Sequence, residues 1–285
     1  MKKEIIVAGG CFWGVQSAFD KVNGVLETEV GYIGGHLKNP TYRDVCSDKT
    51  GHLEAVKIIY DTKQISLEEL LDIFFMIHDP TTLNKQGVDI GSQYQSALFY
   101  QNEAEKKEIR KSIRKNQKYF IKPIVTVVRE KSVFYPAEHE HQKYLQKQGE
   151  KTSRCVEINK ETFLQQKLTP DQYWVMRGRG TEAPFSGEYL YNTEKGVYRC
   201  AACGQKLFLS DYKFSSECGW PAFDNSLPET LVIKKDFSHF MIRDEVICRQ
   251  CGSHLGHLFC DGPTKTGVRY CINSVALMFV PQKQK

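Results

Sequence analysis

Two short cysteine motifs constrain the fold of this chain more than any other feature of its sequence. Cys200-Ala-Ala-Cys203-Gly and Cys248-Arg-Gln-Cys251-Gly share one spacing and are separated by 44 residues. Each motif presents two thiolates from one turn, and two such turns complete the tetrahedral four-sulfur site that suits zinc. Four thiolates leave no open position for water. We therefore expect one structural zinc ion per chain and no organic cofactor.

Other uses of these motifs explain the sequence less well. A redox motif of the thioredoxin type would need no twin, and a zinc ribbon that binds nucleic acid would need a basic, aromatic-rich surface. The chain has 39 basic and 34 acidic residues, a net charge of +5. Its densest basic run, 106–118, has the pattern of a solvated helix face. We therefore expect no nucleic-acid partner.

The length and the cysteine content limit the class of protein. With 285 residues the chain is long enough for one large or two ordinary domains, and it has ten cysteines. No apolar run approaches the roughly 20 residues of a membrane-spanning helix. The start is weakly similar to a lipoprotein signal, but Glu4 interrupts its short apolar part. We expect a cytoplasmic protein without a membrane partner, whose cysteines serve metal binding and redox chemistry.

A reactive cysteine is predicted near the start of the chain. Residues 8–14, Ala-Gly-Gly-Cys-Phe-Trp-Gly, separate a β-branched run at 4–7 from apolar residues at helical spacing. This places Cys11 at a helix N-terminus, where the helix dipole favours a thiolate, so we expect its pKa to be lowered. Phe12 and Trp13 follow as candidate walls of an apolar pocket. The alternative is a buried cysteine among core aromatics.

A candidate proton donor lies on a later strand. Residues 53–60 alternate so that Glu54 shares a strand face with Val56, Ile58 and Tyr60. A carboxyl in apolar surroundings is desolvated, which raises its pKa and lets it donate a proton near neutral pH. The alternative is a solvent-facing glutamate at a strand end.

The first half alternates between strands and helices. Ser66 and Glu69 form a capping box for a helix at 67–78, and Asn102 caps another helix. Strands are expected at 94–100 and 124–128. Strands separated by helices predict an α/β layered domain.

The second half contains a further reactive cysteine. Residues 268–280 alternate strictly, which predicts one strand with Arg269, Cys271 and Asn273 on one face. Arg269 would favour the Cys271 thiolate, and Asn273 can donate a hydrogen bond. His254-Leu-Gly-His257, expected in a loop, and Trp220 supply an imidazole pair and an aromatic wall.

Six motifs in the first half resemble peptide methionine sulfoxide reductase A. They are Gly-Cys-Phe-Trp-Gly at 10–14, Gly-Tyr-Ile-Gly-Gly at 31–35, Pro-Thr-Tyr at 40–42, Gly-His-Leu-Glu-Ala-Val at 51–56, His-Asp-Pro at 78–80 and Gly-Ser-Gln-Tyr at 91–94. The resemblance covers about residues 1–155 and implies a two-layer α+β sandwich.

The resemblance also implies roles for individual residues. Cys11 would attack the sulfoxide sulfur while Phe12 and Trp13 hold the methyl group. The groups expected around the sulfoxide oxygen are Glu54, Tyr42 and Tyr94, with Asp89 nearby. Cys155 fits the resolving cysteine by position, with Cys46 as the alternative, and the histidines of this half are expected in loops or behind the site.

The second half, 167–285, resembles methionine sulfoxide reductase B, whose fold is mostly antiparallel β. The matching motifs are Thr-Glu-Ala-Pro-Phe-Ser-Gly-Glu-Tyr at 181–189, Cys-Gly-Trp-Pro-Ala-Phe at 218–223, His-Leu-Gly-His-Leu-Phe at 254–259 and Arg-Tyr-Cys-Ile-Asn-Ser at 269–274. This resemblance implies that Cys271 is the nucleophile and Cys218 the resolving thiol. It implies that a substrate site is formed by Trp220, His254, His257, Arg269 and Asn273, together with Asp261.

The expected organisation is two reductase domains, at 1–155 and 167–285, joined by a polar linker at 156–166. The linker shows no sustained period, and Thr169-Pro170 begins a helix after it. The resemblances imply repair of both epimers of methionine sulfoxide, free or in proteins, with recycling by thioredoxin. Two other classes remain open: a thiol peroxidase that uses the same cysteines, and a zinc-ribbon scaffold.

Overall fold

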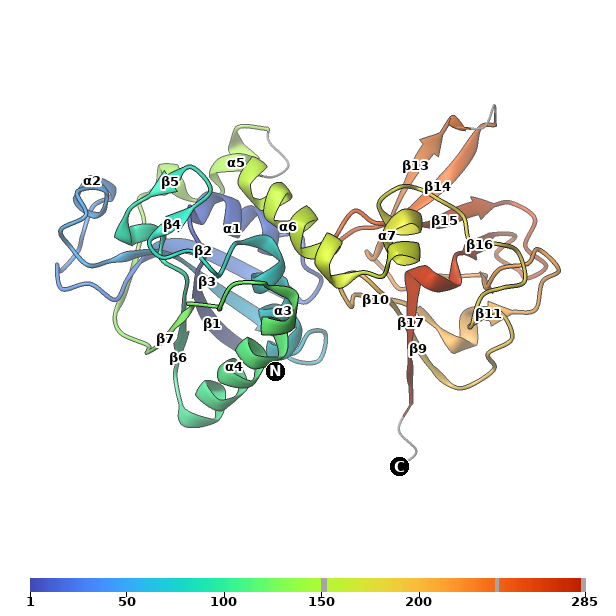
Figure 1. Cartoon of the computed structure of the whole chain (residues 1–285), viewed down its shortest axis with the longest axis horizontal. Coiled ribbons are helices and arrows are strands. Elements are labelled where there is room, and N and C mark those ends of the chain that lie inside the picture. Colours follow the sequence, from blue (N-terminus) through green and yellow to red (C-terminus); the bar gives the residue numbers. More distant parts are fainter. Residues whose placement is uncertain (150–152, 239–240, 283–285) are drawn as a thin grey trace. The chain divides into compact units, whose positions relative to one another are not determined.

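The computed structural model describes residues 1–149, 153–238 and 241–282. The chain divides into two compact units, Met1–Gln166 and Lys167–Lys285. Figure 1 shows the helices and strands of both units. Residues 150–152, which belong to the first expected domain, lie outside the described residues.

The first unit is built on a six-stranded sheet. The order is β7-β6-β1-β3-β2-β8, and every pair is antiparallel except the parallel pair of β6 and β7. The strands are β1 (Lys2–Ala8), β2 (Val25–Ile33), β3 (Leu53–Asp61), β6 (Ala97–Tyr100), β7 (Val127–Glu130) and β8 (Phe134–Pro136). Two short strands, β4 (Lys85–Gln86) and β5 (Asp89–Ile90), pair separately. The predicted strand at 94–100 begins later, because its first residue ends the turn of 3-10 helix η1 (Ser92–Tyr94).

Local sequence signals set where the helices of this unit begin. Ser66 and Glu69 form the predicted capping box at α3 (Leu67–Ile77), and Asn102 caps α4 (Glu103–Asn116). The other helices are α1 (Phe12–Phe19), α2 (Tyr42–Cys46), α5 (Tyr144–Lys147) and α6 (Arg154–Lys167), with 3-10 turns η2 (Gln117–Tyr119) and η3 (His139–His141).

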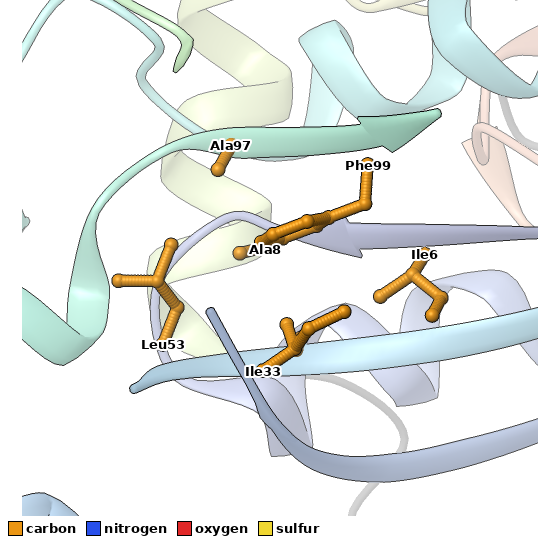
Figure 2. Close-up of a cluster of buried hydrophobic side chains, with 7 residues drawn as sticks. Ile6, Ala8, Ile33, Leu53, Ala97 and Phe99 are labelled. Carbon is orange, nitrogen blue, oxygen red and sulfur yellow. The ribbon is translucent and has the colours of Figure 1, made fainter. Parts of the chain in front are cut away.

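The sheet carries the core of the first unit. Figure 2 shows side chains from four neighbouring strands meeting on one face. This cluster consists of Ile6, Ala8, Ile33, Leu53, Ala55, Ala97 and Phe99. Ile5 and Val7 alternate with the first two and are also buried, so the central strands are covered on both faces. Glu54 lies between Leu53 and Ala55 and therefore points to the opposite face from the cluster.

The second unit is mostly antiparallel β, as expected. One sheet has the order β10-β9-β17 and the other β11-β12-β16-β15-β14-β13. The strands are β9 (Gly196–Cys200), β10 (Lys206–Leu209), β11 (Lys213–Phe214), β12 (Ala222–Phe223), β13 (Leu231–Asp236), β14 (Arg243–Cys248), β15 (His254–Phe259), β16 (Arg269–Ile272) and β17 (Leu277–Pro281). A capping box at Thr169 begins helix α7 (Pro170–Met176), as the sequence predicts. A 3-10 turn, η4 (Ser210–Tyr212), lies between β10 and β11.

The prediction of one continuous strand at 268–280 is wrong. The segment forms β16 and β17, which belong to different sheets, and a 3-10 turn, η6 (Ser274–Ala276), separates them. The carboxylate of Glu182 accepts hydrogen bonds from the backbone N–H groups of Ser274 and Val275. Glu182 therefore satisfies the two amides at the break and takes them out of strand pairing.

Two further expectations about local structure are wrong. The expectation that the linker at 156–166 shows no sustained period is wrong: the segment lies in helix α6, where Val156, Phe163 and Leu164 are spaced to bury one side of the helix. Phe163 packs its ring 5.2 Å from that of Tyr119. The expected loop around His254 is strand β15, which pairs with both β14 and β16.

Candidate active sites and cysteine cluster

Cys11 occupies the N-cap position of α1, as the sequence predicts. Its expected low pKa is wrong for the substrate-free site: burial raises the pKa of the Cys11 thiol to about 12, and the negative charge of Glu54 adds to the rise. Backbone N–H groups of Trp13 and Gly14 act in the opposite direction, which is the helix effect that was expected. Desolvation outweighs them here.

Glu54 is 1% exposed and faces the start of α1. Its Oε2 accepts a hydrogen bond of 3.1 Å from the backbone N–H of Phe12. Burial raises the pKa of the Glu54 carboxyl to about 8, so it carries a proton at neutral pH. Among the described residues, no partner is within hydrogen-bond distance of the buried Oε1. One oxygen is thus fixed, and the other is available to a substrate.

An aromatic cluster lies beside Cys11 and includes two residues that the sequence analysis missed. The ring of Phe12 lies 6.3 Å from that of Tyr42. Tyr144 stacks on Trp13 with ring centroids 4.0 Å apart, and His141 lies 4.3 Å from Tyr42 and 5.6 Å from Trp13. The histidines of this half were expected in loops or behind the site, and His141 contacts the predicted methyl-binding residues directly. The helical spacing of 141 and 144 gave no indication of this contact, which depends on where α5 packs.

Tyr42, Tyr94 and Asp89 come together around Glu54. Burial raises the pKa of both tyrosine hydroxyls, and the charge of Glu54 adds to the effect. Burial also raises the pKa of Asp89, whose charge acts on Glu54 and on Cys11. Both tyrosines remain protonated at neutral pH and can donate hydrogen bonds.

Glu138 is another residue that the sequence analysis missed. Its carboxylate accepts hydrogen bonds of 2.8 Å from the backbone N–H of Tyr42 and from the hydroxyl of Tyr32. Tyr32 is in turn the cross-strand neighbour of Glu54. Glu138 therefore fixes the start of α2 against the sheet at the strand pair that carries Glu54.

Cys155 lies in the first turn of α6, next to the loop that carries Asp89. A Cβ atom on Gly87 would stand 3.1 Å from its sulfur. A Cβ on Gly14 would stand 2.9 Å from Cβ of Ser153, so the same turn packs on α1 three residues after Cys11. Burial raises the pKa of Cys155, and the charge of Asp89 adds to it.

Cys46, the alternative resolving thiol, is exposed at the end of α2. Partial desolvation of its sulfur raises the pKa of Cys46, although a hydrogen bond with the Tyr42 side chain acts to lower it. Both candidate thiols therefore lie close to the predicted substrate residues, one through Asp89 and the other through Tyr42.

The cysteines of the two Cys-x-x-Cys-Gly motifs meet in the second unit; each motif is called a knuckle, and the four knuckle cysteines are Cys200, Cys203, Cys248 and Cys251. Their sulfurs all lie within 4.8 Å of one another, and Cys200–Cys251 and Cys203–Cys248 are each 3.6 Å apart. Zinc–sulfur bonds of about 2.3 Å in a tetrahedron require sulfurs roughly 3.8 Å apart, so the donor set fits zinc. Cys200 ends β9 and Cys248 ends β14, so the cluster joins the two sheets.

The two knuckles have the same backbone geometry. Gly204 and Gly252 follow the second cysteine of each, with φ of 80° and 74°. The N–H of Gly204 donates to the carbonyl of Cys200 (2.8 Å), and that of Gly252 to the carbonyl of Cys248 (2.9 Å). A left-handed residue is needed to close each turn, which explains the glycine in both motifs.

Cys271 and Cys218 form a thiol pair with sulfurs 3.7 Å apart. Burial raises the pKa of Cys271 to about 12, and the charge of Cys218 adds to it, although Arg269 acts to lower it as predicted. The expected net preference for a Cys271 thiolate is therefore wrong for the reduced, substrate-free site. Burial opposes ionisation of Cys218 too, but its contacts with Ser216 and Trp220 lower its net pKa.

A cavity of about 100 Å³ opens at Cys271. It is lined by Thr181, Trp220, Arg243, Gly256, His257, Phe259, Cys271 and Asn273. The indole N–H of Trp220 donates to the carbonyl of Glu182 (3.1 Å), which fixes the ring as a wall. Asn273 donates from Nδ2 to the carbonyl of Leu255 (3.0 Å).

The other residues predicted for this site are paired with carboxylate side chains. Arg269 binds Asp261 through two hydrogen bonds, of 2.8 and 2.7 Å. His254 Nδ1 lies 2.9 Å from Glu245, and His257 Nε2 lies 2.9 Å from Asp236. The sequence analysis missed both of these carboxylates, because they lie 9 and 21 residues from their histidines.

In the described part of the chain, no helix has the length and apolar character that a membrane crossing requires.

Comparisons with known proteins agree with this two-site arrangement. The family model for peptide methionine sulfoxide reductase matches residues 3–172, and the SelR domain model matches residues 168–281. A relative from Vibrio cholerae, "Peptide methionine sulfoxide reductase MsrA/MsrB", is 36% identical, over 99% of this chain and 86% of its own length.

Solved structures are similar to part of the chain. Mxr1 from Saccharomyces cerevisiae in its reduced form is 38% identical, with a TM-score of 0.50 over 52% of this chain and 86% of that one. The complex of Mxr1 with Trx2 matches at 30% identity with a TM-score of 0.37, over 50% of this chain and 84% of that one. The two family matches and the full-length relative show that this chain belongs to the peptide methionine sulfoxide reductases, as an MsrA domain followed by an MsrB domain.

Proposed function

We propose that the MsrA domain reduces the S epimer of methionine sulfoxide and the MsrB domain the R epimer. The sulfoxide sulfur is chiral, and clearing both epimers takes two differently shaped sites. The observation that carries the proposal is the difference between the two sites. Cys11 faces a buried, protonated carboxyl, that of Glu54, whereas Cys271 faces the imidazole of His257.

In the first site, Cys11 is the nucleophile and Glu54 the proton donor. Sγ of Cys11 bonds to the sulfoxide sulfur, and Oε1 of Glu54 gives its proton to the sulfoxide oxygen. The hydroxyl then passes from the methionine sulfur to Sγ of Cys11 as the new bond between the two sulfurs breaks, so methionine leaves and Cys11 becomes a sulfenic acid. The proton that the Cys11 thiol gives up on attack restores the neutral Glu54 carboxyl. A neutral Glu54 also removes the negative charge that opposes ionisation of Cys11. Neutral Glu54 thus favours both the ionisation of Cys11 and the protonation of the sulfoxide oxygen.

The surrounding residues hold the substrate. Phe12 and Trp13 contact the methyl group, and the hydroxyls of Tyr42 and Tyr94 donate to the oxygen. Asp89 stays near the reacting oxygen. Support for these roles comes from the aromatic cluster and from the tyrosine hydroxyls, which remain protonated.

Cys155 resolves the first sulfenic acid, with Cys46 as the alternative. Its thiol attacks the Cys11 sulfur, water leaves, and a disulfide forms, which an external dithiol reduces by exchange. We propose thioredoxin as this dithiol. Support for Cys155 comes from the packing of its helical turn against α1 and against the Asp89 loop.

In the second site, Cys271 attacks sulfur and Cys218 resolves. The 3.7 Å between their sulfurs supports this pair, since only a small shift closes a disulfide. Trp220 holds the methyl group, and Arg269 and Asn273 bind around the oxygen. His257 organises the oxygen and the proton that it receives, and His254 supports the His257 ring, which lies 5.3 Å from its own.

The four knuckle cysteines hold a structural zinc ion. Bound zinc would supply folding free energy to the MsrB domain and no step of the reaction, because four sulfurs complete its coordination. The proposed domain limits are 1–155 and 167–285, with 156–166 connecting them. We place the enzyme in the cytoplasm, where a dithiol pool would keep its cysteines reduced.

The test uses separate assays of the S and R epimers of a blocked methionine sulfoxide. Wild type, Cys11→Ser and Cys271→Ser are compared with a dithiol reductant. We expect Cys11→Ser to lose only S reduction and Cys271→Ser to lose only R reduction. Loss of both activities in either variant would contradict independent sites, and the reverse pattern would contradict the assignment of epimers.

A further inference from the structure

The two histidines of the MsrB domain are held by different carboxylates through different ring nitrogens. His254 uses Nδ1 toward Glu245, whereas His257 uses Nε2 toward Asp236, each at 2.9 Å. An ionised carboxylate accepts a hydrogen bond and therefore fixes the hydrogen on the nitrogen that faces it. The two imidazoles are thus held in opposite tautomers.

Only one of the two imidazoles faces the reacting cysteine. His257 lines the cavity at Cys271 and is the direct cross-strand neighbour of that residue on β16. His254 is 3% exposed and is not among the residues that line this cavity. Its Nε2 is buried without a described hydrogen-bond partner. His257 is therefore the imidazole that can reach a sulfoxide oxygen on Cys271.

Asp236 is held as an anion. Its carboxylate accepts a hydrogen bond of 2.9 Å from the backbone N–H of Ser238 and another of 2.9 Å from Arg243. The Ser238 N–H, His257 and Arg243 together lower the pKa of Asp236. The carboxylate thus cannot take a proton from His257 near neutral pH, and it acts only as an acceptor for Nε2–H.

We propose that Asp236 is a positioning residue of the MsrB site: it holds Nε2–H of His257 and so leaves Nδ1 to give a proton to the sulfoxide oxygen. The proposal rests on the proposed roles of Cys271 and His257. As the Cys271 sulfur bonds to the sulfoxide sulfur, Nδ1 of His257 takes up the proton of the Cys271 thiol and passes it to the oxygen. The ring is then neutral, with its remaining hydrogen on Nε2 still bound to Asp236.

Glu245 has a different part in the same arrangement. It is 2% exposed, binds His254 with Oε1 and pairs with Arg179 through Oε2. It therefore fixes the imidazole behind the cavity, whose ring lies 5.3 Å from that of His257 at an angle of 65°. Glu245 holds the His254 ring, against which His257 packs, whereas Nε2 of His257 is held by Asp236.

The first test observes the tautomers directly. Nitrogen-15 NMR of histidine-labelled, reduced enzyme separates Nδ1–H from Nε2–H imidazoles, and spectra of His254→Gln and His257→Gln assign the two signals. We expect Nε2–H for His257 and Nδ1–H for His254 above the pH at which the rings are neutral. We expect Asp236→Ala to convert His257 to a mixture and leave His254 unchanged. The same tautomer for both rings, or a His257 signal unaffected by Asp236→Ala, would overturn the proposal.

The second test separates chemistry from binding. Pre-reduced enzyme is mixed with the R epimer without reductant, and the methionine formed in a single turnover is followed against substrate concentration. We expect Asp236→Asn to slow the maximal rate at least about 10-fold, with half-saturation changed by less than about twofold, because positioned proton transfer contributes roughly 10²- to 10⁴-fold. An unchanged rate, or a loss confined to half-saturation, would contradict a positioning role.

The control is Asp244→Asn. Asp244 lies on β14, the strand that pairs with β13 and its last residue Asp236, and it forms an ion pair of 2.8 Å with exposed Lys235. Its loss therefore removes a neighbouring carboxylate without touching either histidine. It should leave the R rate unchanged, and all variants should retain their zinc and their melting temperature. If wild type itself does not reduce the R epimer, the proposed function fails. If wild type does and Asp236→Asn is equally fast, only the role of Asp236 fails.

Discussion

The sulfurs of Cys218 and Cys271 lie 3.7 Å apart, so the proposed resolving thiol and the proposed nucleophile of the MsrB domain are close enough to form a disulfide after a small shift. The charge of Cys218 also raises the pKa of Cys271. The two thiols thus titrate as a pair, and the resolving thiol holds back ionisation of the nucleophile.

Replacing Cys218 by Ser should therefore have two opposite effects. The pKa of Cys271 should fall below about 12, because a charged neighbour is removed, so alkylation of Cys271 by iodoacetamide should begin at a lower pH. Turnover of the R epimer with thioredoxin should stop after about one methionine per chain, because the sulfenic acid has no partner. Continued thioredoxin-dependent turnover in this variant would show that another thiol resolves Cys271.

Reduction of the S epimer should decline as pH rises through about 8. Glu54 donates a proton only below its raised pKa, and above that value it is an anion beside Cys11. Single-turnover rates of wild type measured between pH 6 and 10 test this decline. Glu54→Gln should be slower by roughly 10²- to 10⁴-fold with no decline at pH 8. A wild-type decline that persists in Glu54→Gln would assign it to another group.

Gly87→Ala should separate chemistry from recycling in the MsrA domain. The new Cβ would stand 3.1 Å from the Cys155 sulfur at a residue with φ of 59°, and so displace that thiol. The first methionine should form at the wild-type rate, while steady-state turnover with thioredoxin should fall several-fold. Gly149→Ala is the matched control, since its φ is 74° but no atom lies within 4 Å of the new Cβ. Equal steady-state rates for both variants would favour Cys46.

Tyr144→Ala should weaken S-epimer binding. Stacking at 4.0 Å supports Trp13, and such aromatic pairs contribute about 0.5–1.5 kcal/mol, equivalent to roughly a 2- to 10-fold rise in KM. Kinetics with the S epimer measure this change, and R reduction should be unaffected. Tyr191→Ala, at an exposed position of the other unit, should change neither activity. An unaltered KM in Tyr144→Ala would mean that Trp13 is held by its other neighbours.

Cys200→Ser should abolish zinc binding and R reduction together and leave S reduction intact. Three remaining thiolates cannot complete the tetrahedron, and metal binding provides folding free energy to the domain that holds it. Metal analysis and thermal denaturation of the full chain measure both effects. Full R activity in a zinc-free variant would contradict a structural metal.

Local signals predicted much of this molecule because they act over a few residues. The capping boxes at Ser66 and Thr169, the N-cap position of Cys11 and the turn within each Cys-x-x-Cys-Gly motif all depend on neighbours within four positions. The raised pKa of Glu54 was also predicted, since alternation along one strand shows which face is apolar.

The errors arose where distant segments decide the outcome. Burial raised the pKa of Cys11 and Cys271, although the local dipole and charge favour their thiolates. The strand at 268–280 breaks because Glu182, about 90 residues earlier, binds the amides at the break. His141 and Asp236 reach their sites only through tertiary packing, so no spacing in the sequence could identify them.

The break at Ser274–Ala276 also determines how portable the MsrB chemistry is. One continuous segment supplies the proposed nucleophile, Cys271, to one sheet and, a few residues later, an edge strand to the other. An engineer who grafts residues 269–281 onto a single flat sheet would transfer Cys271 without the turn that sets its direction. A transplant that keeps the chemistry must bring Glu182 with it, because that carboxylate anchors the junction from outside the segment.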